Sequence, residues 1–66
     1  MNRPSNDQPE RIVEYRDTTG NGLTLAKLRA FIQSADDANT PPETILRVRV
    51  GFRSQIKAIT TGKKTP

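Results

Sequence analysis

The sequence predicts a small α+β domain: a three-stranded sheet with one helix packed on one of its faces, and flexible termini. Alternating, β-branched stretches at residues 45–50 and 55–60 indicate a hairpin, and a shorter one at 11–17 indicates a further strand. An apolar stripe at helical spacing lies between the first strand and the hairpin. The element order is therefore β-α-β-β, and 66 residues suffice for one domain only.

Both ends of the chain lack side chains that could anchor a core. Residues 1–10 contain two prolines and mostly short polar side chains, and residues 61–66 are equally poor in apolar groups. Such segments bury too little apolar area to offset the entropy lost on ordering. We expect a disordered lead at 1–10, a single α+β domain at 11–60 and a flexible basic tail at 61–66.

A loop at residues 18–22, with two glycines able to take positive φ, leads from the first strand into the helix. Thr24 suits the N-cap because its hydroxyl can accept a free N–H of the first turn. The apolar stripe comprises Leu25, Leu28, Phe31, Ile32 and Ala35. Asn39 can end the helix in a left-handed conformation, and Pro41 and Pro42 prevent its continuation.

The strand at residues 45–50 is the most clearly two-sided. Its apolar face consists of Leu46, Val48 and Val50. Its other face carries Ile45, Arg47 and Arg49. Residues 51–54 are short enough for a hairpin loop, and the returning strand separates imperfectly into Ile56/Ala58 and Lys57/Ile59 faces.

We expect the helix to cover one face of the whole sheet. The stripe would then be buried against the apolar face of strand two, together with Val13 or Ile12, and Ile56. A right-handed crossover makes strands one and two parallel and the third antiparallel to both. The pattern leaves open whether the third strand lies at the edge or in the middle.

Composition excludes much chemistry. Without His or Cys, the chain has no histidine-activated nucleophile, no zinc site of the usual N/S type and no disulfide. No apolar run could span a bilayer, and the first seven residues carry no secretory signal. We expect a non-enzymatic cytoplasmic protein with no cofactor, metal or small-molecule substrate.

Two weaker patterns invite chemical readings. Gly20-Asn21-Gly22 before a helix could cradle a phosphate, but the glycine and lysine spacings of known phosphate loops are missing, so a plain turn is favoured. Asp36 and Asp37 could bind a cation, yet only Glu43 is near in sequence, so polar termination of the helix is favoured.

Basic charge is concentrated at the end of the chain. Residues 45–66 contain six basic and no acidic side chains, which favours an acidic partner. Arg47 and Arg49 lie about 6.6–7 Å apart on one face of a strand, close to the spacing of successive phosphates. Three readings remain open: a solvated face paired with Glu14, a protein interface and a nucleic-acid interface.

The protein interface is the leading functional hypothesis, with another protein or a second copy of the chain as partner. Its predicted residues are Ile45, Arg47, Arg49, Phe52, Arg53, Lys57 and Ile59. Ile59 is included because our register places it with Ile45 beside the arginines. The alternative is nucleic-acid binding through Arg47, Arg49, Arg53, Lys57, Lys63 and Lys64.

Several segments together resemble small β-α-β-β proteins of actinobacterial phages and prophages. They read LTLAKLRAF at 23–31, PPE at 41–43, LRVRVGFR at 46–53 and IKAI at 56–59. The resemblance covers about residues 11–60 and rests on structural motifs. It implies a phage or prophage accessory protein, which would act in the host cytoplasm, and it supplies no catalytic residues.

Overall fold

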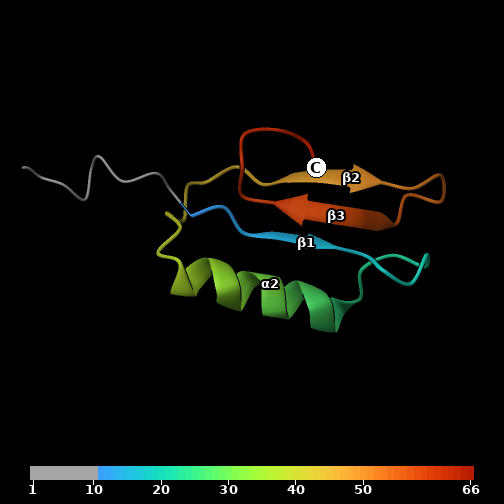
Figure 1. The fold of residues 1–66 in the computed structure, drawn as a ribbon, viewed down its shortest axis with the longest axis horizontal. Coiled ribbons are helices and arrows are strands. Elements are labelled where there is room, and N and C mark those ends of the chain that lie inside the picture. Colours follow the sequence, from blue (N-terminus) through green and yellow to red (C-terminus); the bar gives the residue numbers. More distant parts are fainter. Residues whose placement is uncertain (1–10) are drawn as a thin grey trace, which may run out of the picture.

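The computed structural model describes residues 11–66. Its elements are β1 (Glu14–Arg16), α2 (Leu25–Asp37), β2 (Arg47–Val50) and β3 (Ile56–Thr60). The predicted α+β fold with order β-α-β-β is confirmed, with one helix beside a three-stranded sheet (Figure 1). The expected lead at residues 1–10 lies outside the described part of the chain.

The last strand in sequence is the central strand of the sheet. The strand order is β1-β3-β2, and β3 is antiparallel to both of its neighbours. β1 and β2 therefore run in the same direction, as expected, without touching each other. This answers the question that the sequence left open, because β3 follows β2 through a hairpin and then also pairs with β1.

β1 is shorter than predicted because a side chain replaces part of its backbone pairing. Thr61 donates its N–H to the Val13 carbonyl at 3.0 Å, but the Val13 N–H bonds the Thr61 hydroxyl at 3.1 Å. Gly62 in turn donates to the Thr60 hydroxyl at 2.9 Å, and Thr61 is 8% exposed. The folded part thus extends to Gly62, two residues beyond the predicted boundary.

Both ends of α2 are capped as predicted. The Thr24 hydroxyl accepts the Lys27 N–H at 3.2 Å. Asn39 has φ 60°, the left-handed conformation expected of it. The Thr40 N–H then reaches back to the Ala35 carbonyl at 3.0 Å, which is the Schellman arrangement that satisfies the last carbonyls of a helix.

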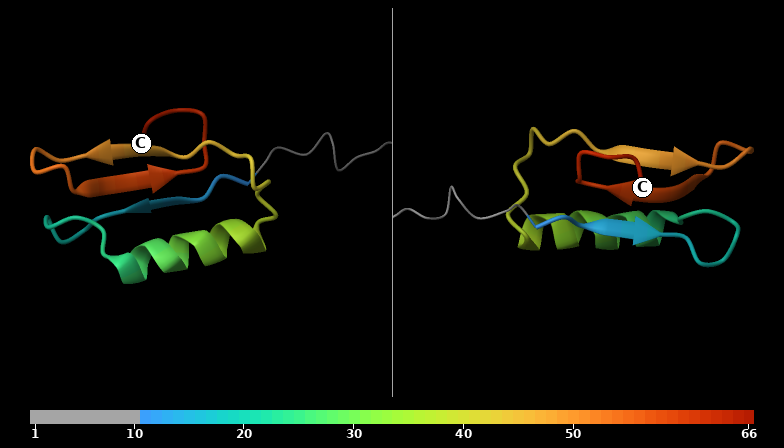
Figure 2. Two further views of the ribbon diagram at one scale, coloured as in Figure 1. Left: turned by 180° about the vertical axis from the view of Figure 1, so that it is seen from behind. Right: turned by 45° about the horizontal axis from the view of Figure 1, so that its top comes forward.

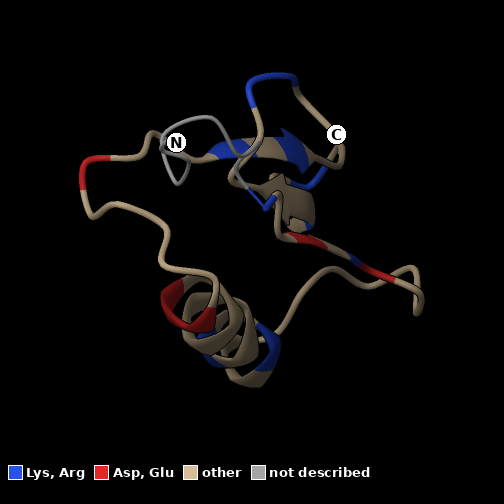
Figure 3. Cartoon of the chain, turned by 60° about the vertical axis from the view of Figure 1, so that its left-hand side comes forward, with Lys and Arg blue, Asp and Glu red and all other residues tan. Residues whose placement is uncertain are grey.

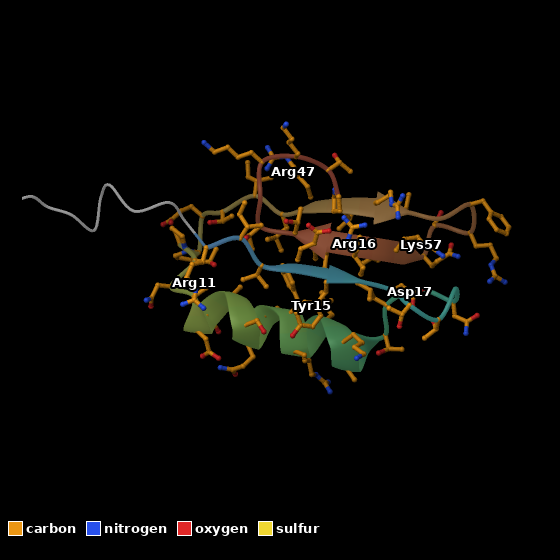
Figure 4. All side chains as sticks on the ribbon, in the orientation of Figure 1. Arg11, Tyr15, Arg16, Asp17, Arg47 and Lys57 are labelled. Atoms are coloured by element: carbon orange, nitrogen blue, oxygen red, sulfur yellow. The ribbon has the colours of Figure 1, made fainter. Side chains whose placement is uncertain are left out.

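The core lies between α2, β1 and β3. Phe31 is 1% exposed and meets the Tyr15 ring edge-on, with 5.8 Å between the ring centroids. The Tyr15 hydroxyl lies 3.0 Å from the Ser34 hydroxyl, so its polar end is also satisfied on the helix. Ile59 pairs with Tyr15 across the ladder and is 4% exposed. Figure 4 shows Tyr15 on the side of β1 that is turned toward α2.

The expectation that α2 covers the whole sheet is wrong. The helix runs along β1, and β2 lies on the far side of β3 from it (Figure 2). Strands are spaced about 4.8 Å apart and a helix is about 10 Å wide, so one helix covers about two strands. Five large apolar side chains of the predicted core are consequently exposed: Leu25, Ile32, Leu46, Val48 and Val50.

The predicted faces of the third strand are also reversed. Ile59 lies between Tyr15 and Val48 on the helix side, and Ala58 lies between Arg16 and Arg49 on the opposite side. Ile59 therefore does not belong to the arginine-bearing face. Both faces of β3 are buried in this structure, since Ala58 on one face is 0% exposed and Ile59 on the other is 4% exposed. The sequence of β3 therefore carries little of the polar alternation that would distinguish its faces.

Candidate interaction surface

The face of the sheet turned away from α2, here called the open face, brings charged side chains of β1 and β2 around small side chains of β3. The register aligns Glu14, Thr60 and Arg47 in one row, because directly paired residues point to the same face. Ala58 forms the next row, between the Arg16 and Arg49 described above. Ala58 and Thr60 are buried, with 0% and 2% of their surfaces exposed.

The arginines of β2 are not neutralised by Glu14. The Glu14 carboxylate is bound instead by Arg16 of the same strand, with 2.6 Å between Oε2 and Nε. The Arg47 guanidinium donates to backbone carbonyls, at 3.2 Å to Gly62 and 3.4 Å to Ile45. Within residues 11–66, neither Arg47 nor Arg49 forms an ion pair.

The C-terminal segment arches over the open face. Its turn at Gly62 is held by Arg47, and a hollow of about 680 Å³ lies between the segment and β1. A second hollow, of about 330 Å³, places Ile45 and Lys63 beside Arg47. Basic residues accordingly gather on the hairpin and the C-terminal segment, away from the acidic end of α2 (Figure 3).

The hairpin tip presents an aromatic side chain to solvent. Ser54 donates to the Gly51 carbonyl at 2.9 Å and has φ 66°, which gives a three-residue turn with a left-handed closing residue. Phe52 at this turn is 94% exposed. The Arg53 guanidinium lies 5.6 Å from the centroid of the Phe52 ring, so cation and ring form one exposed pair.

Lys57 lies apart from the predicted surface. Its ammonium is 3.8 Å from the Asp17 carboxylate and 3.5 Å from the Gly20 carbonyl. Lys57 falls where the register between β2 and β3 shifts, and its side chain is turned to the loop that follows β1. The prediction that Lys57 and Ile59 lie on the arginine-bearing face is therefore wrong. The sequence of this strand did not show which of its two alternating sets of side chains faces the helix.

The loop between β1 and α2 is organised by Asp17. Its carboxylate accepts both the hydroxyl and the N–H of Thr19, at 2.7 and 3.0 Å. It also accepts the N–H groups of Gly20 and Gly22, at 2.9 and 3.0 Å. These bonds, those from Thr19 foremost, lower the pKa of Asp17 to about 2.

The hydrogen bonds to Asp17 also argue against the hypothesis that Gly20-Asn21-Gly22 binds a phosphate. The glycine N–H groups that an anion would need already bind a carboxylate of the chain itself. The loop is therefore a turn whose glycine N–H groups are hydrogen-bonded within the chain. An Asp followed two residues later by Thr is the sequence signal for such a turn, which our sequence analysis missed.

Sequence reasoning predicted an apolar strip on the helix side of β2 but wrongly expected α2 to bury it. It consists of Leu46, Val48 and Val50, which are exposed because α2 does not reach them. Between the start of this strip and the helix, a shallow hollow of about 190 Å³ is lined in part by Ile32 and Pro41. β2 thus presents arginines on one side and an apolar strip on the other.

No known protein family, curated protein or solved structure matches this chain. Within residues 11–66, no helix is both long and apolar enough to cross a membrane. The resemblance to phage and prophage proteins stays a prediction.

Proposed function

We propose that the chain is a non-enzymatic protein-interaction module, a phage or prophage accessory protein, that binds an acidic partner through the β2–β3 hairpin. Arg47 and Arg49 carry the proposal. Their guanidinium groups lie on one face of an edge strand, and Glu14, the acid in the same row of the sheet as Arg47, is bound by Arg16. Glu43 lines the hollow beside Arg47 but forms no ion pair with it. Two cations without carboxylate partners among residues 11–66 are available to carboxylates from outside.

The surroundings of the arginines fit a protein partner. Ile45 is 71% exposed beside Arg47, and Phe52 stands almost fully exposed at the hairpin tip. Arginine and aromatic side chains are the types enriched at the centre of protein interfaces. Because the tip is a closed turn, Phe52 is presented from a short, hydrogen-bonded loop, which reduces the entropy cost of binding.

An acidic protein fits better than a second copy stacked on the open face. Two open faces placed against each other would bring Arg47 and Arg49 of both copies together. Lys63 and Lys64 of each copy would add to the positive charge. Like charges brought together in an interface oppose association, so the proposed partner is a different, acidic host or phage protein.

Selection from a random peptide display library tests this proposal. We expect the wild-type chain to enrich peptides rich in Asp and Glu, and Arg47→Glu/Arg49→Glu to lose them. The matched control, Lys27→Glu/Arg29→Glu, reverses two exposed charges on α2 and should select the same peptides as wild type. Enrichment that is absent, or that survives reversal of Arg47 and Arg49, contradicts the proposal.

Nucleic-acid binding is a second candidate. It is favoured by the two arginines at about phosphate spacing and by Lys63 beside Arg47. Against it, Tyr15 is the aromatic residue of the strands and faces the helix. Among residues 11–66, the one exposed ring on which a base could stack is Phe52, at the hairpin tip.

Fluorescence anisotropy with random duplex and single-stranded DNA at two salt concentrations separates the candidates. Binding that weakens steeply with salt and is lost in Arg47→Ala/Arg49→Ala supports nucleic acid. We expect no such binding at physiological salt.

A further inference from the structure

The outer edge of β2 is open to backbone pairing. β2 is the last strand of the order β1-β3-β2, and no hydrogen bond joins its outer edge to any of residues 11–66. Exposed edges of this kind are the sites at which an extended segment of another protein adds a strand.

The ladder fixes which backbone groups point outward. The Thr61 N–H bonds the Val13 carbonyl, and the Asp17 N–H bonds the Lys57 carbonyl. Residues 57, 59 and 61 therefore direct their backbone groups toward β1. Residues 58 and 60 then direct theirs toward β2, where they pair with Arg49 and Arg47. The N–H and C=O of Val48 consequently point away from the sheet, at the free edge.

The side chains at this edge have opposite character on the two faces. Arg47 and Arg49 flank it on the open face, and the apolar strip flanks it on the helix side. A strand added here would place its alternate residues beside the two arginines and the others beside the strip. Acidic residues suit the first set, and apolar residues suit the second.

We propose that β2 binds its partner by strand addition, and that the partner segment is an extended peptide in which acidic and apolar residues alternate. The inference rests on the proposed function and specifies its partner. The backbone bonds to Val48 provide the attachment. Carboxylates on the Arg47 and Arg49 side, with apolar side chains over the strip, determine the register.

A second copy of the chain is a poorer occupant of the same edge. Antiparallel pairing of β2 with itself keeps its faces matched when the register is centred on Val48, Arg47 or Arg49. A register centred on Val48 sets Arg47 opposite Arg49 of the other copy, and a register centred on either arginine sets that arginine opposite itself. Like charges directly opposite each other destabilise a strand pair. Residues 1–10 fit no better, since their two prolines lack N–H donors and no apolar residue alternates with an acid.

Backbone methylation of a peptide tests strand addition on the wild-type chain. The probe is Gly-Ser-Glu-Val-Glu-Val-Glu-Ser-Gly with a fluorophore, and the control is a peptide of the same composition with the three Glu residues contiguous. In antiparallel addition the Val residues of the probe pair with Val48 and direct their N–H groups to β2. N-methylation of these Val residues should weaken binding about tenfold or more, whereas methylation of the Glu residues should change it little.

A variant of the chain gives the complementary test. Val48→Pro removes the outward N–H without removing a bond to β3, and proline is tolerated on edge strands in this orientation. We expect Val48→Pro to lose the probe, while Val48→Ile, which keeps the N–H and the apolar face, binds as wild type does. Circular dichroism establishes that both variants remain folded. If the Val48→Pro variant is unfolded, the binding of the methylated peptides to the wild-type chain tests the inference without it.

The outcomes separate this inference from the proposed function. Strand addition is supported if N-methylation weakens binding at only the Val residues or only the Glu residues of the probe. Weakening at the Val residues indicates antiparallel addition, and weakening at the Glu residues indicates parallel addition. Equal binding of the probe, its methylated forms and the contiguous-Glu control overturns it, and leaves an acidic partner bound by charge alone. Failure of every acidic peptide to bind overturns both proposals.

Discussion

Phe31 is the side chain on which the core depends most. It is the large apolar residue that the structure buries completely among residues 11–66, and it joins α2 to β1 through Tyr15. The apolar stripe of the helix predicted five core positions. Which of these side chains is buried depends on where each lies relative to β1. Leu25 and Ile32 lie on the same stripe and remain half exposed or more.

Phe31→Ala should therefore unfold the chain. Truncation of a buried Phe costs about 3–5 kcal/mol. The whole stability of a folded chain of this size is about 3–8 kcal/mol. Far-ultraviolet circular dichroism and thermal melting measure the loss. The same substitution at the exposed Phe52 is the control and should leave the melting curve unchanged; equal effects at both positions would contradict the core described here.

Asp17 should make stability depend on acid pH. Its pKa is lowered from 3.8 to about 2, so the charged form stabilises the fold. That contribution is complete above pH about 4 and is lost as the pH falls through about 2. We expect Asp17→Asn to melt at a lower temperature than wild type at neutral pH, and the difference to shrink between these two values. Asp36→Asn, which removes an exposed charge at the end of α2, is the matched control and should not lower the melting temperature at neutral pH.

At the scale of the elements, local signals predicted more than long-range ones. The helix and its caps depend on neighbouring residues, and Thr24 and Asn39 perform the roles expected of them. The two-sided strand at Arg47–Val50 is also correct, because alternation determines which side chains share a face. The position of β3 and the faces of Lys57 and Ile59 depend on pairing with a distant β1, for which the sequence carries no local signal.

The C-terminal cap of α2 offers a test at this scale. Asn39 has φ 60°, where a Cβ without a compensating polar group costs about 1–2 kcal/mol. Asn39→Ala should lower the free energy of unfolding by about this amount, and Asn39→Gly should preserve it or raise it. Urea denaturation measures both variants. An Ala variant as stable as the Gly variant would mean that helix closure does not require the left-handed residue.

For the candidate surface, the sequence predicted which residues are exposed on the hairpin better than it predicted which of them share a face of the sheet. The charge block and the alternation identify Arg47 and Arg49, and the hairpin signal identifies Phe52. What it could not predict is that one helix leaves β2 uncovered, since that follows from the order of the strands. The free edge and its apolar strip are products of that order.

At the scale of the whole molecule, we expect the chain to be a monomer. Charge disfavours both stacking of open faces and pairing of β2 with itself. Size-exclusion chromatography with light scattering measures the mass across protein concentrations. A dimer that Val48→Pro dissociates would show that a second copy occupies the edge, contrary to our inference.

The central place of β3 also bears on how the chain is made. β1 and β2 have no contact with each other and pair only with a strand that leaves the ribosome after both. Until that strand emerges, neither has a partner, and the side chain of Tyr15 has no Ile59 to pack against. Sheet assembly is thus deferred until synthesis has passed Thr60, and a nascent chain stopped in the hairpin loop would lack the strand on which both β1 and β2 pair.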